Sequence, residues 1–452
     1  FCVQTPQQKR PAKDLDFAPV LVDFGPAQQE FHVGLGAAAV PGVAAGIFAV
    51  HEALGALPLP EIMAPAIDLA RRGVMQTPYQ AHLTEILQPI LERTPAALAL
   101  VSPPDTPDMP ARAGQRVVHA DLADLLSLLA REGSAGFYQG EPGQRLVRDC
   151  RTQGGLLTHA DLAAYQVIRR KPVHTFSHGA EFWFNAPPSP GGSLVAFALA
   201  MLDPLTARTR ERSGELEALL LLGAMDAANR LRAETLKDNL DEALAARMLS
   251  DTHLEQWRAQ ALPADLFRRG TTHISVVDEL GNCASLTSSN GEGCGYVIPG
   301  TGVMVNNMLG EEDLNPAGFH RWQASTRLAS MMCPTLARLA DGSEVALGTG
   351  GSNRIRSAVL QVLVNLCCHN MPLERAVAAP RLHLEGDSLD FEAGMDASVE
   401  AALLTRWPGA KAWPGTSLFF GGVHAVQRFP DGHFCGVGDP RRSGAVLQAG
   451  PE

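Results

Sequence analysis

The sequence lacks the features of several common protein classes. None of its apolar runs reaches the roughly 18–20 residues that a bilayer-spanning helix needs. It has no dense run of Lys and Arg, and its formal net charge is −11. We therefore expect neither nucleic acid nor a membrane as a partner. The eight cysteines are scattered and include no Cys-x-x-Cys pair, which favours reduced, buried thiols over a disulfide framework.

Several catalytic motifs are also absent. The sequence contains no Gly-x-Ser-x-Gly, no His-Glu-x-x-His, and no glycine loop with the spacing of a P-loop or of Gly-x-Gly-x-x-Gly. His273, His369 and His383 do not have the spacing of metal ligands, so we expect them to be structural. The sequence therefore predicts neither a metal ion nor a cofactor.

The composition is that of a globular protein with a large core, because 46% of the 452 residues are hydrophobic and 19% are charged. Apolar periodicity predicts helices up to Leu54 and over residues 62–72, 78–93, 119–131 and 213–230, with Ser213 as an N-cap. Thr158 and Asp161 have the spacing of a capping box. Residues 18–24 suggest an extended strand, and residues 184–193 suggest the end of a strand, a rigid loop and the start of a helix. Residues 231–270 have no β pattern.

The bond between Gly270 and Thr271 is the most informative point in the chain. It immediately precedes a strand-like run over residues 272–277. If this bond were cut, Thr271 would hold both a hydroxyl nucleophile and a free α-amine. That amine has a reference pKa of about 7.7–8.0 and can act as a base near neutral pH. The alternative is a simple junction between a loop and a strand.

The next segments predict a hairpin. A turn over residues 278–282, centred on Leu280, is followed by a second strand-like run from Cys283 to Ser289. A regular antiparallel register would then pair Thr271 with Ser289, and cross-strand neighbours lie about 4.5–5.5 Å apart. A hydroxyl from Ser289, or from Thr287 on the same face, could reach the nucleophile. The alternative is that these hydroxyls face solvent or that a bulge shifts the register.

Two further segments have chemistry that suggests a site. Residues 345–355 predict a strand, a glycine loop and a helix, and such a loop can bind a phosphate, form an oxyanion hole or be a structural turn. Asn306 and Asn307 precede an acidic run that starts at Glu311. These amides and carboxylates could recognise a substrate amine, or the acidic run could be a solvated turn.

Taken in order along the chain, these residues resemble the γ-glutamyltransferase family of N-terminal-nucleophile hydrolases. The resemblance rests on residues 271–278, 306–308, 333–335, 348–355 and 439–441, and on upstream segments at residues 40–42, 136–138, 154–158, 161–165 and 187–192. It implies an α+β fold, a four-layer αββα sandwich. It also implies a precursor that cuts itself into a large subunit, residues 1–270, and a small catalytic subunit, residues 271–452.

The resemblance also implies roles for individual residues. Thr271 would attack an acyl carbonyl, and water or an amine acceptor would release the acyl group. Ser289 would support the nucleophile. The oxyanion hole would come from Gly350 and Gly351, or from Gly351 and Ser352 if the match is ungapped. The residues that would bind substrate are Asn290, Asn307, Glu311 and Ser330.

The chain departs from the family pattern where the glutamyl group would be held. Ala18 occupies the position of an Arg that grips the glutamyl carboxylate, and Met308 replaces a Gln. Glu311 is the candidate amine-binding acid. Ser330 is kept, whereas Cys333 replaces a second serine. Because Arg binds carboxylates through a two-pronged contact, we expect an acyl group that need not be γ-glutamyl.

We therefore predict a self-processed amidohydrolase or acyltransferase acting on a small γ-glutamyl or related amide, as in glutathione metabolism. The alternatives are an acylase for a non-glutamyl amide, or an unprocessed, non-catalytic homologue that binds small molecules. The two cleaved subunits would form a heterodimer, and its further association is left open. The sequence begins at Phe1, so we expect N-terminal residues to be missing. A cytoplasmic location is expected in preference to a periplasmic one.

Overall fold

The structure is a computed structural model that describes residues 1–23, 28–206, 214–235, 240–258, 271–315 and 317–450. Its chain forms two compact units. The first unit comprises Phe1–Arg169 and Ser289–Leu328, and the second comprises Arg170–Ser288 and Ala329–Glu452. These spatial units differ from the two subunits expected from self-cleavage, so the division at Thr271 stays a prediction. Among the described residues, no helix is long and apolar enough to cross a bilayer.

The first unit is mainly helical. Its principal helices are α1 (Val43–Leu54), α2 (Leu59–Arg72), α3 (Pro78–Leu91), α4 (Pro95–Ala99), α5 (Ala120–Glu132), α6 (Ala135–Tyr138), α7 (Glu141–Thr152) and α8 (His159–Ala164). Its strands form three short antiparallel pairs: β1 (Ala18–Asp23) with β2 (Gln28–Val33), β3 (Val74–Met75) with β4 (Arg116–Val117), and β9 (Val297–Ile298) with β10 (Val303–Met304). Short 3-10 turns η3 (Met308–Gly310) and η4 (Glu312–Leu314) follow β10.

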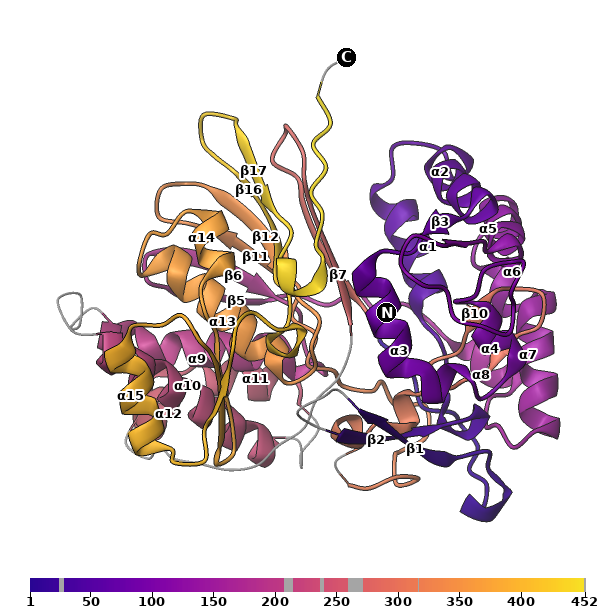
Figure 1. The fold of residues 1–452 in the computed structure, drawn as a ribbon, viewed down its shortest axis with the longest axis horizontal. Helices are drawn as coiled ribbons and strands as arrows, with labels where there is room; N and C mark the ends of the chain where they lie inside the picture. The colour runs from indigo at the N-terminus through magenta and orange to yellow at the C-terminus, as the bar shows by residue number, and fades with distance from the viewer. Residues whose placement is uncertain (24–27, 207–213, 236–239, 259–270, 316, 451–452) are drawn as a thin grey trace. The chain divides into compact units, whose positions relative to one another are not determined.

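The second unit is built on a six-stranded antiparallel sheet in the order β17-β16-β12-β11-β6-β5 (Figure 1). The strands are β5 (Val173–Ser177), β6 (Ala180–Phe184), β11 (Thr335–Arg338), β12 (Glu344–Gly348), β16 (His424–Arg428) and β17 (Phe434–Val437). The helices are α9 (Pro190–Thr206), α10 (Gly214–Thr235), α11 (Glu242–Met248), α12 (Asp251–Arg258), α13 (Arg354–Cys367), α14 (Leu373–Ala378) and α15 (Ala397–Arg406). A smaller sheet contains β13 (Leu382–Glu385), β14 (Ser388–Glu392) and β15 (Lys411–Trp413).

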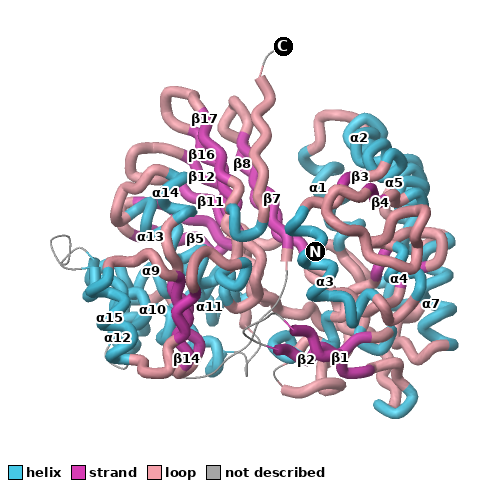
Figure 2. The backbone as a smooth tube through the Cα atoms, in the orientation of Figure 1, coloured by secondary structure: helices cyan, strands magenta, loops and turns pink. Residues whose placement is uncertain are grey.

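Two structural layers bury the central strand β12. Helices α9 and α13 pack on the six-stranded sheet, and α10 packs on α9 (Figure 1). A hairpin of β7 (Thr272–Val277) and β8 (Cys283–Ser288) also packs on this sheet, and β7 runs beside β16 (Figure 2). Because it is covered in this way, β12 has the continuous apolar run Val345, Ala346 and Leu347, all fully buried. The mixed helix and sheet content agrees with the expected class, while the four-layer sandwich stays a prediction.

Most of the local predictions are confirmed. The predicted helices correspond to α1, α2, α3, α5 and α10, although α10 extends to Thr235 and its expected N-cap, Ser213, lies outside the described residues. Thr158 and Asp161 form the reciprocal hydrogen bonds of a capping box at the start of α8. The segment over residues 231–270, for which no strands were expected, contains α11 and α12 in its described part.

Candidate functional site

The hairpin that follows Thr271 has the predicted register. Val277 pairs with Cys283, and the ladder continues to Thr272 and Ser288. The turn is closed by Asp278, whose Oδ1 accepts hydrogen bonds from the Leu280 and Asn282 amides at 3.0 and 2.8 Å. Thr271 and Ser289 lie one residue beyond the ladder, in different units, so their pairing stays a prediction.

The inward face of the hairpin is polar. His273 is buried, and its Nδ1 and Nε2 atoms each lie 2.8 Å from a hydroxyl, those of Thr287 and Ser275 respectively. The Ser285 hydroxyl donates to the Leu347 carbonyl (2.9 Å) and accepts from the Thr335 amide (3.0 Å). These bonds attach the hairpin to the six-stranded sheet. The Thr287 hydroxyl, which was the alternative partner for the nucleophile, is instead hydrogen-bonded to His273.

Burial, together with a smaller effect of nearby His424, lowers the pKa of His273 to about 3. The imidazole is therefore neutral near physiological pH and offers one donor and one acceptor to its two hydroxyl partners. The ring also packs against Gly348 so closely that a Cβ built there would lie 2.3 Å from it. This histidine therefore has the structural role that the sequence predicted, and it fixes the spacing between β7 and the end of β12.

The glycine loop after β12 lies directly against Thr271. A Cβ built on Gly350 would be 1.8 Å from the Thr271 carbonyl oxygen and 3.1 Å from its Cα. Only a glycine permits this approach. Gly351 has a φ of 128° and Ser352 a φ of 51°, so the loop turns sharply before α13 begins. Backbone amides beside a nucleophile can stabilise a developing oxyanion. Gly270, the other half of the proposed scissile bond, lies outside the described residues.

In the first unit, four predicted residues meet around Gly291. The Gly291 amide donates to the Ser289 hydroxyl at 3.1 Å, and the Asn307 amide donates to the Asn290 carbonyl at 3.2 Å. A Cβ on Gly291 would lie 2.1 Å from Asn307 Oδ1 and 2.2 Å from Glu311 Oε1. Asn307 and Glu311 are 0% and 3% exposed. Glu311, the first residue of the acidic run, is therefore buried and not part of a solvated turn. This arrangement of amide and carboxylate groups can recognise an amine or an amide.

Ser330 belongs to the second unit. Its hydroxyl and that of Ser189 lie 2.8 Å apart, and Ser189 also donates to the Ser330 carbonyl at 3.0 Å. Nearby Cys333 is fully buried, and this burial raises the pKa of its thiol to about 12. Cys333 therefore lies in the protein core rather than at a surface that could contact substrate.

Ala18 is the first residue of β1 and pairs with Val33. Its neighbour Asp16 accepts a hydrogen bond from the Leu35 amide (2.8 Å) and forms an ion pair with Arg93. Phe17 stacks on His32 with ring centroids 4.7 Å apart. Residues 16–18 match the family segment that would hold the glutamyl group. In this chain the segment contains an aromatic contact and a carboxylate that is already paired with a cation.

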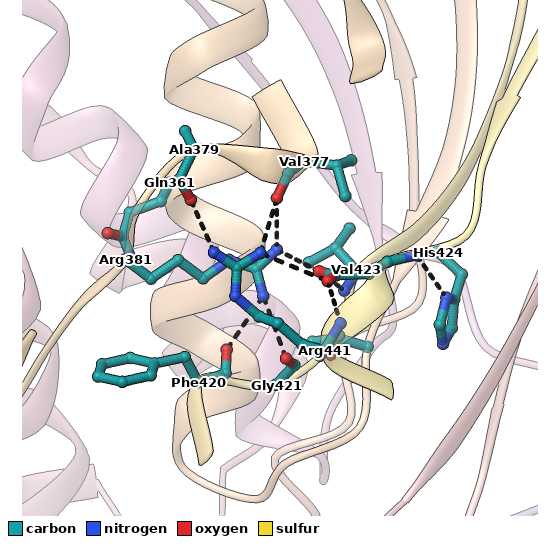
Figure 3. A network of polar contacts seen from close by, with 12 residues as sticks. Gln361, Val377, Ala379, Arg381, Phe420, Gly421, Val423, His424 and Arg441 are labelled. Carbon is teal, nitrogen blue, oxygen red and sulfur yellow. Dashed lines mark hydrogen bonds and ion pairs between the residues drawn. The ribbon is translucent and has the colours of Figure 1, made fainter. Parts of the chain in front are cut away.

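A buried ion network lies in the second unit beyond the glycine loop (Figure 3). Arg381 Nη2 contacts Asp439 Oδ2 at 2.6 Å, while Arg441 pairs with Glu392 and with Asp439. Both guanidinium groups also donate to the Val377 carbonyl, as Figure 3 shows. Four charges are thereby paired in a region that excludes water. The sequence pattern at residues 439–441 suggested a family motif but gave no role for these residues.

The chain is similar in sequence to known proteins. Acylase ACY 1 proenzyme of Pseudomonas sp. (strain SE83) is 33% identical over 439 residues, which cover 92% of this chain and 76% of the acylase. Glutathione hydrolase proenzyme of Escherichia coli (strain K12) is 27% identical over 440 residues, covering 90% and 74% of the two chains. These two relatives are both named as proenzymes.

The fold is similar to that in the crystal structure of cephalosporin acylase from Bacillus halodurans. The TM-score is 0.79 at 21% identity, covering 100% of this chain and 84% of that chain. The family model described as Gamma-glutamyltranspeptidase matches residues 19–449. The chain therefore belongs to the gamma-glutamyltranspeptidase family.

Proposed function

We propose that the protein is a self-processed amidohydrolase or acyltransferase whose nucleophile is Thr271. The observation that carries the proposal is the close approach of Gly350 to Thr271, at the first residue before a rigidly bonded hairpin. In this proposal, cleavage before Thr271 frees an α-amine that acts as the base for the neighbouring hydroxyl. The hydroxyl attacks an amide carbonyl, the amine leaves, and water or an amine acceptor releases the acyl group.

The remaining residues have supporting roles in the same proposal. The amides of the glycine loop, with Gly351 common to both predicted pairs, would stabilise the oxyanion. Ser289 would support the nucleophile. Asn290, Asn307, Glu311 and Ser330 would bind the polar parts of the substrate. The protein would function as a heterodimer of its two cleaved subunits.

We further propose that the acyl group is not restricted to γ-glutamyl. Ala18 supplies no cation for a glutamyl carboxylate, and the nearby Arg93 is already paired with Asp16. The relatives include both an acylase and a glutathione hydrolase, so the family accommodates either type of substrate. This observation favours acylase activity on a non-glutamyl amide as the second candidate.

Gel electrophoresis of purified protein tests the nucleophile. We expect fragments with the calculated masses of residues 1–270 and 271–452, and Thr271 as the first residue of the smaller one. Thr271→Ala should remain whole and inactive, whereas Thr271→Ser, which keeps a hydroxyl, should retain cleavage. Wild-type protein that stays whole and hydrolyses amides would overturn the nucleophile assignment.

A panel of acyl anilides tests the acyl preference. We expect acyl anilides that lack a terminal carboxylate, such as a butyryl anilide, to be hydrolysed with a kcat/KM at least equal to that of the γ-glutamyl anilide. Ala18→Arg should shift the ratio toward the γ-glutamyl substrate through KM, because it restores a partner for a carboxylate. A strong γ-glutamyl preference in the wild type would show that another residue binds the glutamyl carboxylate.

A further inference from the structure

Residues 417–423, here called the brace segment, are held on one side by the buried ion network. Arg381 Nη1 donates to the carbonyls of Phe420 (3.1 Å) and Gly421 (3.2 Å). Asp439 Oδ2 accepts from the Val423 amide at 2.9 Å (Figure 3). Since these partners are buried and already paired with each other, they fix the backbone of the brace segment.

The other side of the brace segment contacts the glycine loop through Thr349. The Gly422 amide donates to Thr349 Oγ1 at 2.8 Å, and that hydroxyl donates in turn to the Gly350 carbonyl at 2.7 Å. Thr349 is 0% exposed, so no water competes for these bonds. A Cβ built on Gly421 would lie 2.9 Å from the Gly350 carbonyl oxygen, which shows how closely the two backbones approach.

The direction of one amide follows from these contacts. The Gly350 carbonyl and the Gly351 amide belong to the same planar trans peptide group, so they point in opposite directions. A hydroxyl that fixes the carbonyl therefore also fixes the N–H of Gly351. This amide belongs to both of the predicted oxyanion pairs, and stabilisation of an oxyanion depends on donors that are already oriented before reaction.

We infer that Thr349 is a positioning residue, which orients the Gly351 amide toward the oxyanion by joining the glycine loop to the brace segment. This inference rests on the proposed function, because it assigns the loop to the stabilisation of an acyl-transfer intermediate. It adds a chain of contacts that the sequence resemblance did not contain: from Asp439 and Arg381 to residues 420–423, and from there through Thr349 to Gly350.

Isosteric replacement of Thr349 tests this inference. Thr349→Val keeps the shape and removes both hydrogen bonds, whereas Thr349→Ser keeps the hydroxyl. In processed protein we expect Thr349→Val to lower kcat roughly 10- to 100-fold, with KM within about twofold, because misoriented donors act on the transition state. Thr349→Ser should retain kcat within about threefold. Thr84→Val is the matched control, since it removes a buried hydroxyl that donates to the Gln80 carbonyl at 3.0 Å in α3.

Several results would overturn the inference. These are an unchanged kcat in Thr349→Val, an equal loss in Thr349→Ser, and a loss of the same size in Thr84→Val. If Thr349→Val does not fold, Asp439→Asn replaces it, because this change weakens the opposite anchor of the brace segment. It should then show the same selective loss in kcat, and an unchanged kcat would again refute the role.

Amide hydrogen exchange separates this inference from the proposed function. Thr349→Val removes the acceptor of the Gly422 amide, so peptides covering residues 417–423 should exchange faster than in the wild type. A wild-type protein that neither cleaves itself nor hydrolyses amides would refute the proposed function, and the exchange rates would still decide whether Thr349 holds the brace segment. An active wild type with unchanged exchange and kcat in Thr349→Val would refute the inference alone.

Discussion

His273 should make the stability of the second unit strongly dependent on pH. Its pKa is lowered to about 3 in the folded protein, chiefly by burial, against about 6.5 in an unfolded chain. Between these two values the unfolded state binds more protons than the folded state. Stability is therefore fully present above about pH 6.5 and is lost as the pH falls toward about 3.

The size of this effect follows from the same values. Each unit of pKa difference corresponds to about 1.4 kcal/mol. With a folded pKa of about 3, the unfolding free energy should fall by about 3 kcal/mol between about pH 7 and about pH 4 through this histidine alone. That is a large part of the typical total of about 5–15 kcal/mol for a protein.

The test compares wild-type protein with His273→Gln, which can still bond to hydroxyls but does not titrate. Urea unfolding followed by tryptophan fluorescence gives the free energy of each protein across this pH range. Every other titrating group is common to both proteins, so the change with pH in their difference reports on His273.

We expect the unfolding free energy of the wild type minus that of His273→Gln to fall by about 3 kcal/mol as the pH is lowered from about 7 to about 4. His273→Gln should be less stable at neutral pH because the fit to Thr287 and Ser275 is imperfect. A difference that stays constant within about 0.5 kcal/mol would show that His273 titrates normally. The assignment of a neutral, buried imidazole would then be wrong.

Two further predictions concern the glycine loop and the first unit. Gly350→Ala should lower self-cleavage at least about tenfold on a gel, because its Cβ would lie 1.8 Å from the Thr271 carbonyl oxygen; Gly415→Ala, where nothing lies within 4 Å, should cleave normally. Equal cleavage by both variants would refute the close approach. Asn306→Ala should lower the free energy of unfolding, measured in urea, by about 2–4 kcal/mol. The buried Asn306 side chain accepts hydrogen bonds from the backbone amides of Ala39 and Met308 and donates one to the Ala39 carbonyl, and all three are lost. If the free energy of unfolding fell by less than about 1 kcal/mol, the Asn306 side chain would not be buried with these three hydrogen bonds.

The local part of the fold could be predicted from the sequence because its causes are local. Periodic apolar residues predicted α5, and the spacing of Thr158 and Asp161 predicted the cap of α8. The β7–β8 register followed from the position of a single turn. These elements depend on side chains only a few residues apart, so one sequence was sufficient to predict them.

The support around the glycine loop could not be predicted in this way. Thr349 and Gly422 are 73 positions apart, and Arg381 and Asp439 are 58 apart. No pattern within either segment indicates the other, because the contact depends on how two strands and a helix pack. Asn307 and Glu311 were both predicted as substrate-binding residues, whereas their packing around Gly291 was not predicted, because it depends on how the chain folds back on that glycine.

The inward polar face of the hairpin has a consequence for folding. Ile274 and Val276, two of the three apolar residues of β7, point outward and are 55% and 53% exposed, while His273 and Ser275 face the sheet. A slip of one residue would exchange these two sets and leave apolar side chains opposite unpaired backbone and hydroxyl groups. A slipped hairpin would also move Thr271 away from Gly350. Under the proposed function, self-cleavage would therefore occur only in chains whose hairpin has the correct register, because only these place Thr271 against Gly350.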